Sequence, residues 1–229
     1  MIYHHLHAGG ELDTAQNMIL ELIPSGSRVL DLGCSSGYLS AAIRDRRGCR
    51  VFGVELDPAA ARLARRRGFE VVNGSMTGAR TRKKVEAWGR FDVVVAADVL
   101  EHLADPAASL RWIRESVLTP AGLLAVSIPN VVHFNNRRQV LLGRFDYTDH
   151  GLLDRTHLRF FTAASLRETL TRSGYQVQTF ERVADVFPGD RFVVRSPRLR
   201  WIKGRFNGLL RRGFPDLFTW QFVVGAVPA

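Results

Sequence analysis

Short apolar runs alternate with segments of helical periodicity along the first half of the chain. We expect strands at 28–32, 51–55, 69–72, 91–96 and 122–128, because these runs are rich in β-branched residues and end at turn-forming residues. Helices are expected at 13–23, from the glycine-rich turn to about residue 47, at 58–67 and at 105–118. Strands that alternate with helices through short connections must run parallel to one another, with helices covering both faces of the sheet. The fold class predicted is therefore α/β with a doubly wound sheet.

The alternation stops after Pro129. A helix is expected again at 163–173, and two further strands at 175–183 and 218–227. Long irregular stretches inside a compact domain are typical of lids and binding loops. We therefore expect one domain over residues 1–229, with lid or substrate segments at about 130–161 and 185–217.

Composition adds limits on class and compartment. The 229 residues suffice for one hydrophobic core, and no apolar run approaches the roughly 20 residues of a membrane-spanning helix. Residues 1–7 lack the basic flank and apolar core of an export signal, so we expect a cytoplasmic protein. The two cysteines, Cys34 and Cys49, are not spaced as a zinc motif and are expected to remain thiols.

The formal charge of +10 comes almost wholly from arginine, and it suits either an anionic partner or a solvated basic surface. Within 195–212, a helix would place Leu199, Ile202 and Phe206 on one face among basic residues. Such a helix is expected to cover the sheet edge, with contact to an anionic membrane or a lipid-linked substrate as the alternative. Nucleic acid is not an expected partner, because no RNA-binding motif is present.

The segment 28–38 carries the strongest chemical signal. A strand reaches Asp31 and breaks into a loop containing Gly33 and Gly37, and the next strand ends at Glu55. An acid at the tip of the strand after a glycine loop is placed to accept hydrogen bonds from ribose hydroxyls. The ligand is therefore expected to contain a ribose.

The amino-acid sequence of the loop distinguishes between cofactors that contain a ribose. Dinucleotide sites use G-x-G-x-x-G, whereas here Ser35 replaces the second glycine and Asp31 would repel a phosphate. With this loop, the sequence resembles the class I S-adenosylmethionine-dependent methyltransferases, whose usual wording is close to D-x-G-C-G-x-G. The resemblance implies S-adenosylmethionine as cofactor. It also implies a single-domain Rossmann-like sheet of seven strands, with the last strand antiparallel and inserted between the fifth and sixth.

The resemblance also implies a set of cofactor residues. Asp31 would meet the methionine ammonium, Glu55 the ribose hydroxyls and Leu56 the adenine face, while Ser75 stands where the family often has an aspartate. The full cofactor set is Asp31, Gly33, Cys34, Ser35, Gly37, Glu55, Leu56, Ser75, Met76 and Ala97.

One helical turn after the fourth strand would place Asp98, Glu101 and His102 on a shared face. Similar clusters bind a divalent ion in methyltransferases that modify the terminal ribose of small RNAs and in certain ubiquinone-pathway O-methyltransferases. His157 is the later histidine that would complete such a site. A metal is allowed but not expected, because the same Glu-His pair is common in family members without one.

The stretch 150–162 resembles a signature of a bacterial subfamily often encoded beside sugar, polysaccharide and secondary-metabolite enzymes. We therefore expect methyl transfer to a small molecule, at a hydroxyl oxygen, with nitrogen as an alternative atom. Removing the hydroxyl proton requires a base, for which His157 is the first candidate and His102 the second. The candidate substrate contacts, including arginines suited to an anionic group, are Arg155, Arg159, His133 and Tyr147.

Two alternative functions remain at this point. The first is a metal-dependent RNA ribose 2′-O-methyltransferase, and the second, from a different class, is an NAD(P)-dependent reductase on a Rossmann fold.

Overall fold

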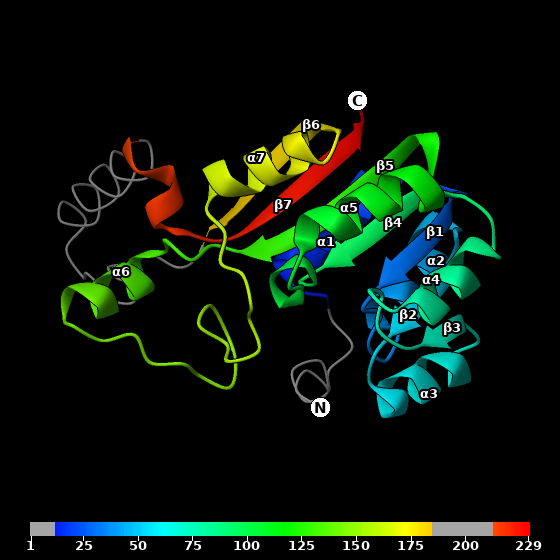
Figure 1. The fold of residues 1–229 in the computed structure, drawn as a ribbon, viewed down its shortest axis with the longest axis horizontal. Helices are drawn as coiled ribbons and strands as arrows, with labels where there is room; N and C mark the ends of the chain where they lie inside the picture. Colours follow the sequence, from blue (N-terminus) through cyan, green and yellow to red (C-terminus); the bar gives the residue numbers. More distant parts are fainter. Residues whose placement is uncertain (1–11, 185–212) are drawn as a thin grey trace, which may run out of the picture.

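The fold is a seven-stranded sheet between two layers of helices (Figure 1). The structure, a computed structural model, describes residues 12–184 and 213–229. The amino-terminal histidines, the amphipathic 195–212 segment and most of the second expected lid segment lie outside the described residues. The strands are β1 (Arg28–Leu32), β2 (Arg50–Glu55), β3 (Glu70–Asn73), β4 (Phe91–Ala97), β5 (Leu118–Pro129), β6 (Tyr175–Ala184) and β7 (Thr219–Pro228).

The strand order is β3-β2-β1-β4-β5-β7-β6. Strands β1 to β5 pair in parallel, whereas β7 pairs antiparallel with both β5 and β6. The predicted fold class and the inserted antiparallel strand are both confirmed. In such a sheet, ligands bind beyond the carboxyl ends of the parallel strands.

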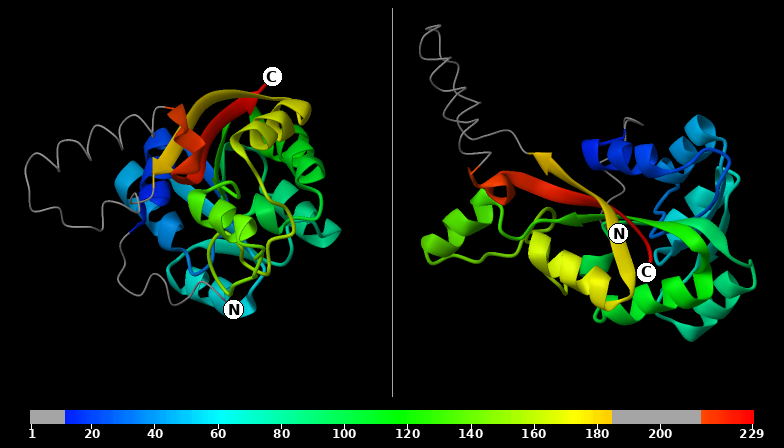
Figure 2. Two further views of the ribbon diagram at one scale, coloured as in Figure 1. Left: turned by 90° about the vertical axis from the view of Figure 1, so that its left-hand side faces the viewer. Right: turned by 90° about the horizontal axis from the view of Figure 1, so that it is seen from above.

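Each face of the sheet carries its own helices, as the edge-on view in Figure 2 shows. One apolar cluster packs α1 (Thr14–Leu22), α2 (Tyr38–Arg47) and α3 (Pro58–Arg66) against the sheet, and the other packs α4 (Ala79–Glu86), α5 (Pro106–Trp112) and α7 (Ala163–Arg172). The helix starts follow the sequence signals, since the side chains of Asp13, Asp57, Asp105 and Thr162 each cap a helix.

Within the part of the chain where strands and helices alternate, two stretches differ from the sequence expectation. Helix α4 was not predicted, because most of its residues are polar and only Thr81 and Val85 are buried. Strand β5 begins at Leu118 rather than at 122, and the predicted preceding helix ends as a π-helical turn over Ile113–Val117. In the pairing of β4 with β5, Phe91 lies opposite Leu118 and Val93 lies opposite Leu123, so β5 contains extra residues that form a bulge. The bulge accommodates a proline in the strand.

The segment 130–161 extends beyond the carboxyl ends of the strands (Figure 1). It contains a helix that was not predicted, α6 (Phe134–Leu141), and two isolated bridges within it pair Asn130 with Phe161 and Thr148 with Asp154. Backbone hydrogen bonds to Trp220 and Glu101 join the segment to the rest of the protein. The division of the chain into one domain with two lid segments stays a prediction. Within the described ranges, no helix combines the length and apolar character needed to cross a bilayer.

Candidate active site

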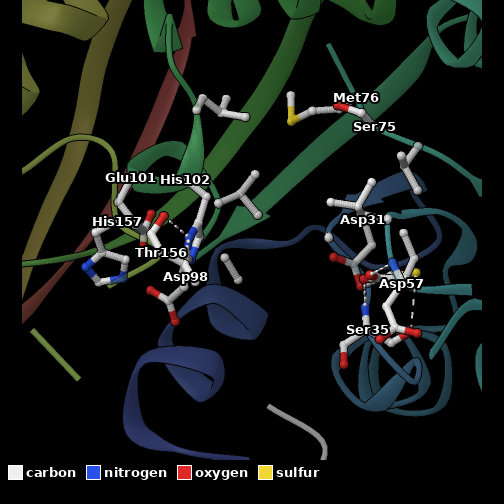
Figure 3. Close-up of a pocket in the computed structure, with 18 of the residues that line it drawn as sticks. Asp31, Ser35, Asp57, Ser75, Met76, Asp98, Glu101, His102, Thr156 and His157 are labelled. Carbon is white, nitrogen blue, oxygen red and sulfur yellow. Dashed lines mark hydrogen bonds between the residues drawn. The ribbon is translucent and has the colours of Figure 1, made fainter. Parts of the chain in front are cut away.

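A cavity of about 1540 Å³ opens at the carboxyl ends of β1, β2 and β4. It exceeds the roughly 300–1,000 Å³ of an ordinary small-molecule site, so it has room for a cofactor and an acceptor together. Figure 3 shows side chains facing it from two sides, with Asp31, Ser35 and Asp57 on one side and Glu101, His102, Thr156 and His157 on the other. We call these the cofactor side and the acceptor side.

The glycine loop on the cofactor side depends on left-handed backbone. Gly33 has φ +71° and Ser35 has φ +50°, and the amides of Gly33 and Cys34 both donate to the Val54 carbonyl. A Cβ on Gly33 would lie 2.9 Å from Cγ2 of Val99. Ser35 therefore adopts the conformation for which the family uses glycine, and the loop keeps its shape.

Nine of the ten predicted cofactor residues line the cavity, namely Asp31, Gly33, Cys34, Ser35, Glu55, Leu56, Ser75, Met76 and Ala97. The exception is Gly37, which caps α2 with φ +83° and is close to Phe69. Burial raises the pKa of the Cys34 thiol, which fits its expected state.

Asp31 is buried beside the loop, with only 2% of its surface exposed. Its Oδ2 accepts a 2.6 Å hydrogen bond from the Ser40 hydroxyl. Burial raises the pKa of Asp31 from 3.8 to about 7, opposed by the Ser40 hydrogen bond. Because the carboxyl is held at a pKa near neutrality, a cationic group placed against it would favour its ionised form.

Glu55 links the two loops of the cofactor side. Its Oε2 accepts from the Ser35 amide at 2.8 Å, and its Oε1 accepts from the Asp57 amide at 2.7 Å. Leu56 is 69% exposed and lines the cavity, which leaves an apolar surface for a planar ring. The Ser75 hydroxyl instead bonds to Thr77, while Met76 is buried.

Glu101, His102 and His157 come together on the acceptor side. Each offers one potential ligand atom, and these atoms all lie within 4.8 Å of one another. Glu101 belongs to the 3₁₀ turn Leu100–His102 after β4, and the Glu101 carbonyl accepts from the amides of Leu158 and Arg159, which brings His157 to the turn. Burial raises the pKa of Glu101 well above its usual value, whereas burial and the neighbouring His102 lower that of His157.

Asp98, the remaining metal candidate, is not one of this group. It has φ +54°, an unusual conformation for a residue other than glycine, and its Oδ1 accepts from Ser127 Oγ and from Gln221 Nε2. Burial raises its pKa. Gln221 and Trp220, which also line the cavity, come from β7 and were missed by sequence reasoning; the only signal was a polar glutamine within an apolar strand.

The four predicted substrate contacts do not line this cavity. Arg155 forms an ion pair with Asp149 at 2.9 Å on the surface. Nε and Nη2 of Arg159 both donate to the Ala104 carbonyl. His133 is buried as the cap of α6, with its ring edge against Trp220, and Tyr147 is half exposed beside Phe145. His150, in the same segment as these four, does line it.

Comparisons with known proteins place the chain among methyltransferases. It is 36% identical over 113 residues to a ubiquinone biosynthesis O-methyltransferase of Xanthomonas axonopodis pv. citri, covering 48% of this chain and 46% of the relative. A protein of the same name from Marinobacter nauticus is 34% identical over 110 residues, 46% of this chain and 45% of the relative. The chain thus spans about half the length of the curated relatives it matches.

Solved structures share the fold. An S-adenosylmethionine-dependent methyltransferase of Archaeoglobus fulgidus aligns over 93% of this chain and 92% of its own, with a TM-score of 0.64 and 18% identity. Phosphoethanolamine N-methyltransferase 2 of Haemonchus contortus, solved with S-adenosylmethionine, aligns over 99% of this chain and 56% of its own, with a TM-score of 0.63 and 15% identity.

The model of the methyltransferase domain family matches residues 4–179. The predicted class and cofactor are thereby confirmed: the chain belongs to the methyltransferase domain family, as a class I S-adenosylmethionine-dependent member.

Proposed function

We propose that this protein transfers the methyl group of S-adenosylmethionine to a hydroxyl oxygen of a small, uncharged acceptor. The observation that carries the proposal is His157, a buried imidazole of lowered pKa on the wall opposite the cofactor loop. Such a group is uncharged at neutral pH and is able to accept a proton. The names of the curated relatives, which are O-methyltransferases, support oxygen as the atom that is methylated.

The cofactor side is suited to the methyl donor. We expect Asp31 to meet the ammonium, Glu55 to bind the ribose hydroxyls through its remaining lone pairs, and Leu56 to lie against the adenine. The bound donor supplies an activated methyl group. The loop amides and buried carboxyl hold one orientation of it, and orientation is a large part of the catalytic effect in a transfer between two bound groups.

The tautomer of His157 determines which nitrogen acts as the base. Its Nδ1 lies 3.3 Å from the carbonyl oxygen of Leu152, which accepts hydrogen bonds but cannot donate one. Nδ1 therefore carries the hydrogen, and Nε2 keeps the lone pair that takes the acceptor's proton. His102 is held in the same way by the Thr156 carbonyl at 3.2 Å.

Charge on the cavity wall argues for an uncharged acceptor. Arg82, near Met76, is the only lysine or arginine among the described lining residues, while the acceptor side carries Asp98 and Glu101. An anionic acceptor would meet carboxyl groups without a cation to offset them. For the same reason, the RNA ribose alternative has little support, because phosphates need basic partners along their path. The family match leaves the reductase alternative without support.

The test is methyl transfer from radiolabelled S-adenosylmethionine to matched pairs of small acceptors bearing either a hydroxyl or an amine. We expect label on the hydroxyl compound, and a loss of about 10²–10⁴ in kcat for His157→Gln, as for removal of a general base. His150→Gln serves as the matched control, because His150 also lines the cavity but lies outside the cluster. Label transferred only to amines, or equal rates for the two variants, would contradict the proposal.

A further inference from the structure

The glycine loop contains one residue in a backbone conformation that serine rarely adopts. Ser35 has φ +50°, and the turn it belongs to is closed by the Gly37 amide, which donates to the Cys34 carbonyl at 2.8 Å. Turns that need a positive φ at a central position usually have glycine there, because a side chain makes that conformation unfavourable. A residue strained in this way persists only where its surroundings hold it. Groups around the loop must therefore maintain its shape.

One of these groups lies on the cavity side of the loop. Glu55 accepts from the Ser35 amide at 2.8 Å, and Glu55 itself lines the cavity. This bond restrains the peptide group that precedes Ser35, but it does not restrain the part of the turn that follows. The restraint on the following residues comes from outside the cavity.

Arg67 is the residue that holds the loop from outside. Its Nη1 donates to the carbonyl oxygen of Ser36 and, at 3.3 Å, to the Ser36 hydroxyl. Its guanidinium carbon also lies 4.4 Å from the centroid of the Tyr38 ring, as in a cation–π contact. Ser36 and Tyr38 both line the cavity, whereas Arg67 does not. Arg67 therefore contacts residues of the cavity wall without being part of the wall itself.

The backbone of Arg67 is fixed independently of its side chain. Its amide donates to carbonyls in the last turn of α3, and its own carbonyl accepts from Nη1 of Arg44 at 3.0 Å. Arg44 belongs to α2, the helix that follows the glycine loop. Because these bonds use the backbone of Arg67, they remain possible when its side chain is shortened.

We propose that Arg67 is a positioning residue for S-adenosylmethionine, which holds the glycine loop in the conformation that binds the cofactor without contacting the cofactor. Ser35 makes this conformation less favourable than glycine would, and the bonds from Arg67 offset that cost. Without them, the loop should spend part of its time in other conformations. The apparent affinity then falls in proportion to the fraction of molecules whose loop is competent to bind. This role concerns the cofactor alone and does not depend on which acceptor is methylated.

The test is isothermal titration calorimetry of the full chain with S-adenosylmethionine and with S-adenosylhomocysteine. Arg67→Ala should raise both dissociation constants about tenfold, the size expected for the loss of one hydrogen bond from a charged group. Arg67→Lys should recover part of the affinity, since an ammonium is able to donate to Ser36 but lacks the planar fork. Arg66→Ala is the matched control, because it removes the same charge from the adjacent, exposed position at the end of α3. A cooperative urea transition shows that each variant folds.

A second substitution distinguishes this role from a general loss of stability. Ser35→Gly removes the conformational cost at position 35, so the competent loop should be well populated even without Arg67. Arg67→Ala should therefore weaken binding about tenfold with the natural loop but only about twofold in the Ser35→Gly background. A merely structural contribution of Arg67 would weaken binding equally in the two backgrounds.

Equal dissociation constants for Arg67→Ala and Arg66→Ala would overturn the inference. A loss of the same size with and without Ser35→Gly would also overturn it, because the Arg67 side chain would then act independently of the loop conformation.

Discussion

Cofactor affinity should depend on pH through Asp31. In the protein without ligand, burial holds the pKa of this carboxyl at about 7. If the donor's ammonium binds the ionised form, affinity rises about tenfold per pH unit as the pH increases towards 7, and then levels off. The donor's own α-amino group loses its proton at about pH 8, so affinity should fall again above that value. We expect a bell-shaped profile with its maximum between about pH 7 and 8.

The raised pKa of Asp31 also determines how the stability of the folded protein changes with pH. Between the ordinary pKa of 3.8 and about 7, the folded protein holds a proton on Asp31 that the unfolded chain has lost. The contribution of Asp31 to stability is thus fully present below pH 3.8 and is lost as the pH rises through about 7. One pKa unit corresponds to about 1.4 kcal/mol, so the free energy of unfolding should fall by roughly 4 kcal/mol over this pH range. A bound cation should recover part of it, so the ligand-induced rise in Tm should be larger at pH 8 than at pH 6.

Isothermal titration calorimetry with S-adenosylmethionine from pH 5.5 to 9 tests this expectation. Asp31→Asn keeps an acceptor for the Ser40 hydroxyl but has no ionisable group, so its acid limb should be flat. Asp45→Asn is the control, because Asp45 is an exposed partner of Arg44 remote from the cavity. A flat profile for the unmodified protein, or an acid limb that survives in Asp31→Asn, would refute the reasoning.

Two further substitutions test the backbone and the acceptor wall. Gly33→Ala should unfold at a lower urea concentration than Gly26→Ala and should bind S-adenosylmethionine more weakly. Both glycines have positive φ, a conformation that costs alanine about 1–2 kcal/mol. Only at Gly33 does the added Cβ also come close to a neighbouring side chain, that of Val99. Equal stability of the two variants would count against the close contact. Gln221→Leu should lower the free energy of unfolding by about 1–3 kcal/mol, because the Asp98 carboxyl loses a hydrogen-bond donor. The loss should be larger at pH 8 than at pH 5, since the ionised carboxylate needs that donor most. Gln176 is exposed on β6, and Gln176→Leu should leave the free energy of unfolding nearly unchanged in the same urea titrations. A loss independent of pH would argue against the Asp98 contact.

The sequence was most informative where local chemistry determines structure. Asp57 followed by Pro58 predicts the start of α3. Nine of the ten residues predicted for the cofactor line one cavity, and their contacts with the cofactor stay a prediction. The same approach failed for α4, whose exposed face is so polar that hydrophobic periodicity is weak.

The acceptor side was harder to predict because it is assembled from distant parts of the chain. The bond between Gln221 and Asp98 joins residues 123 positions apart, and no local pattern indicates it. Arg155 and Arg159 were predicted to contact substrate from their chemistry alone. In the structure Arg155 pairs with Asp149 and Arg159 donates to the Ala104 carbonyl, and their contact with a substrate stays a prediction. The meeting of His157 with Glu101 follows from backbone hydrogen bonds that depend on the folded path of the 130–161 segment.

The position of β7 has a consequence for the order in which the protein takes shape during synthesis. This strand leaves the ribosome after all the others, yet it lies between β5 and β6 and pairs with both. A nascent chain is therefore able to form the glycine loop early, whereas β6 has no neighbour in the described sheet, and the wall that includes Gln221 does not exist, until β7 has been synthesised. Chains that still lack β7 therefore have an incomplete wall opposite the glycine loop, so the enclosed cavity is among the last features of the described fold to form.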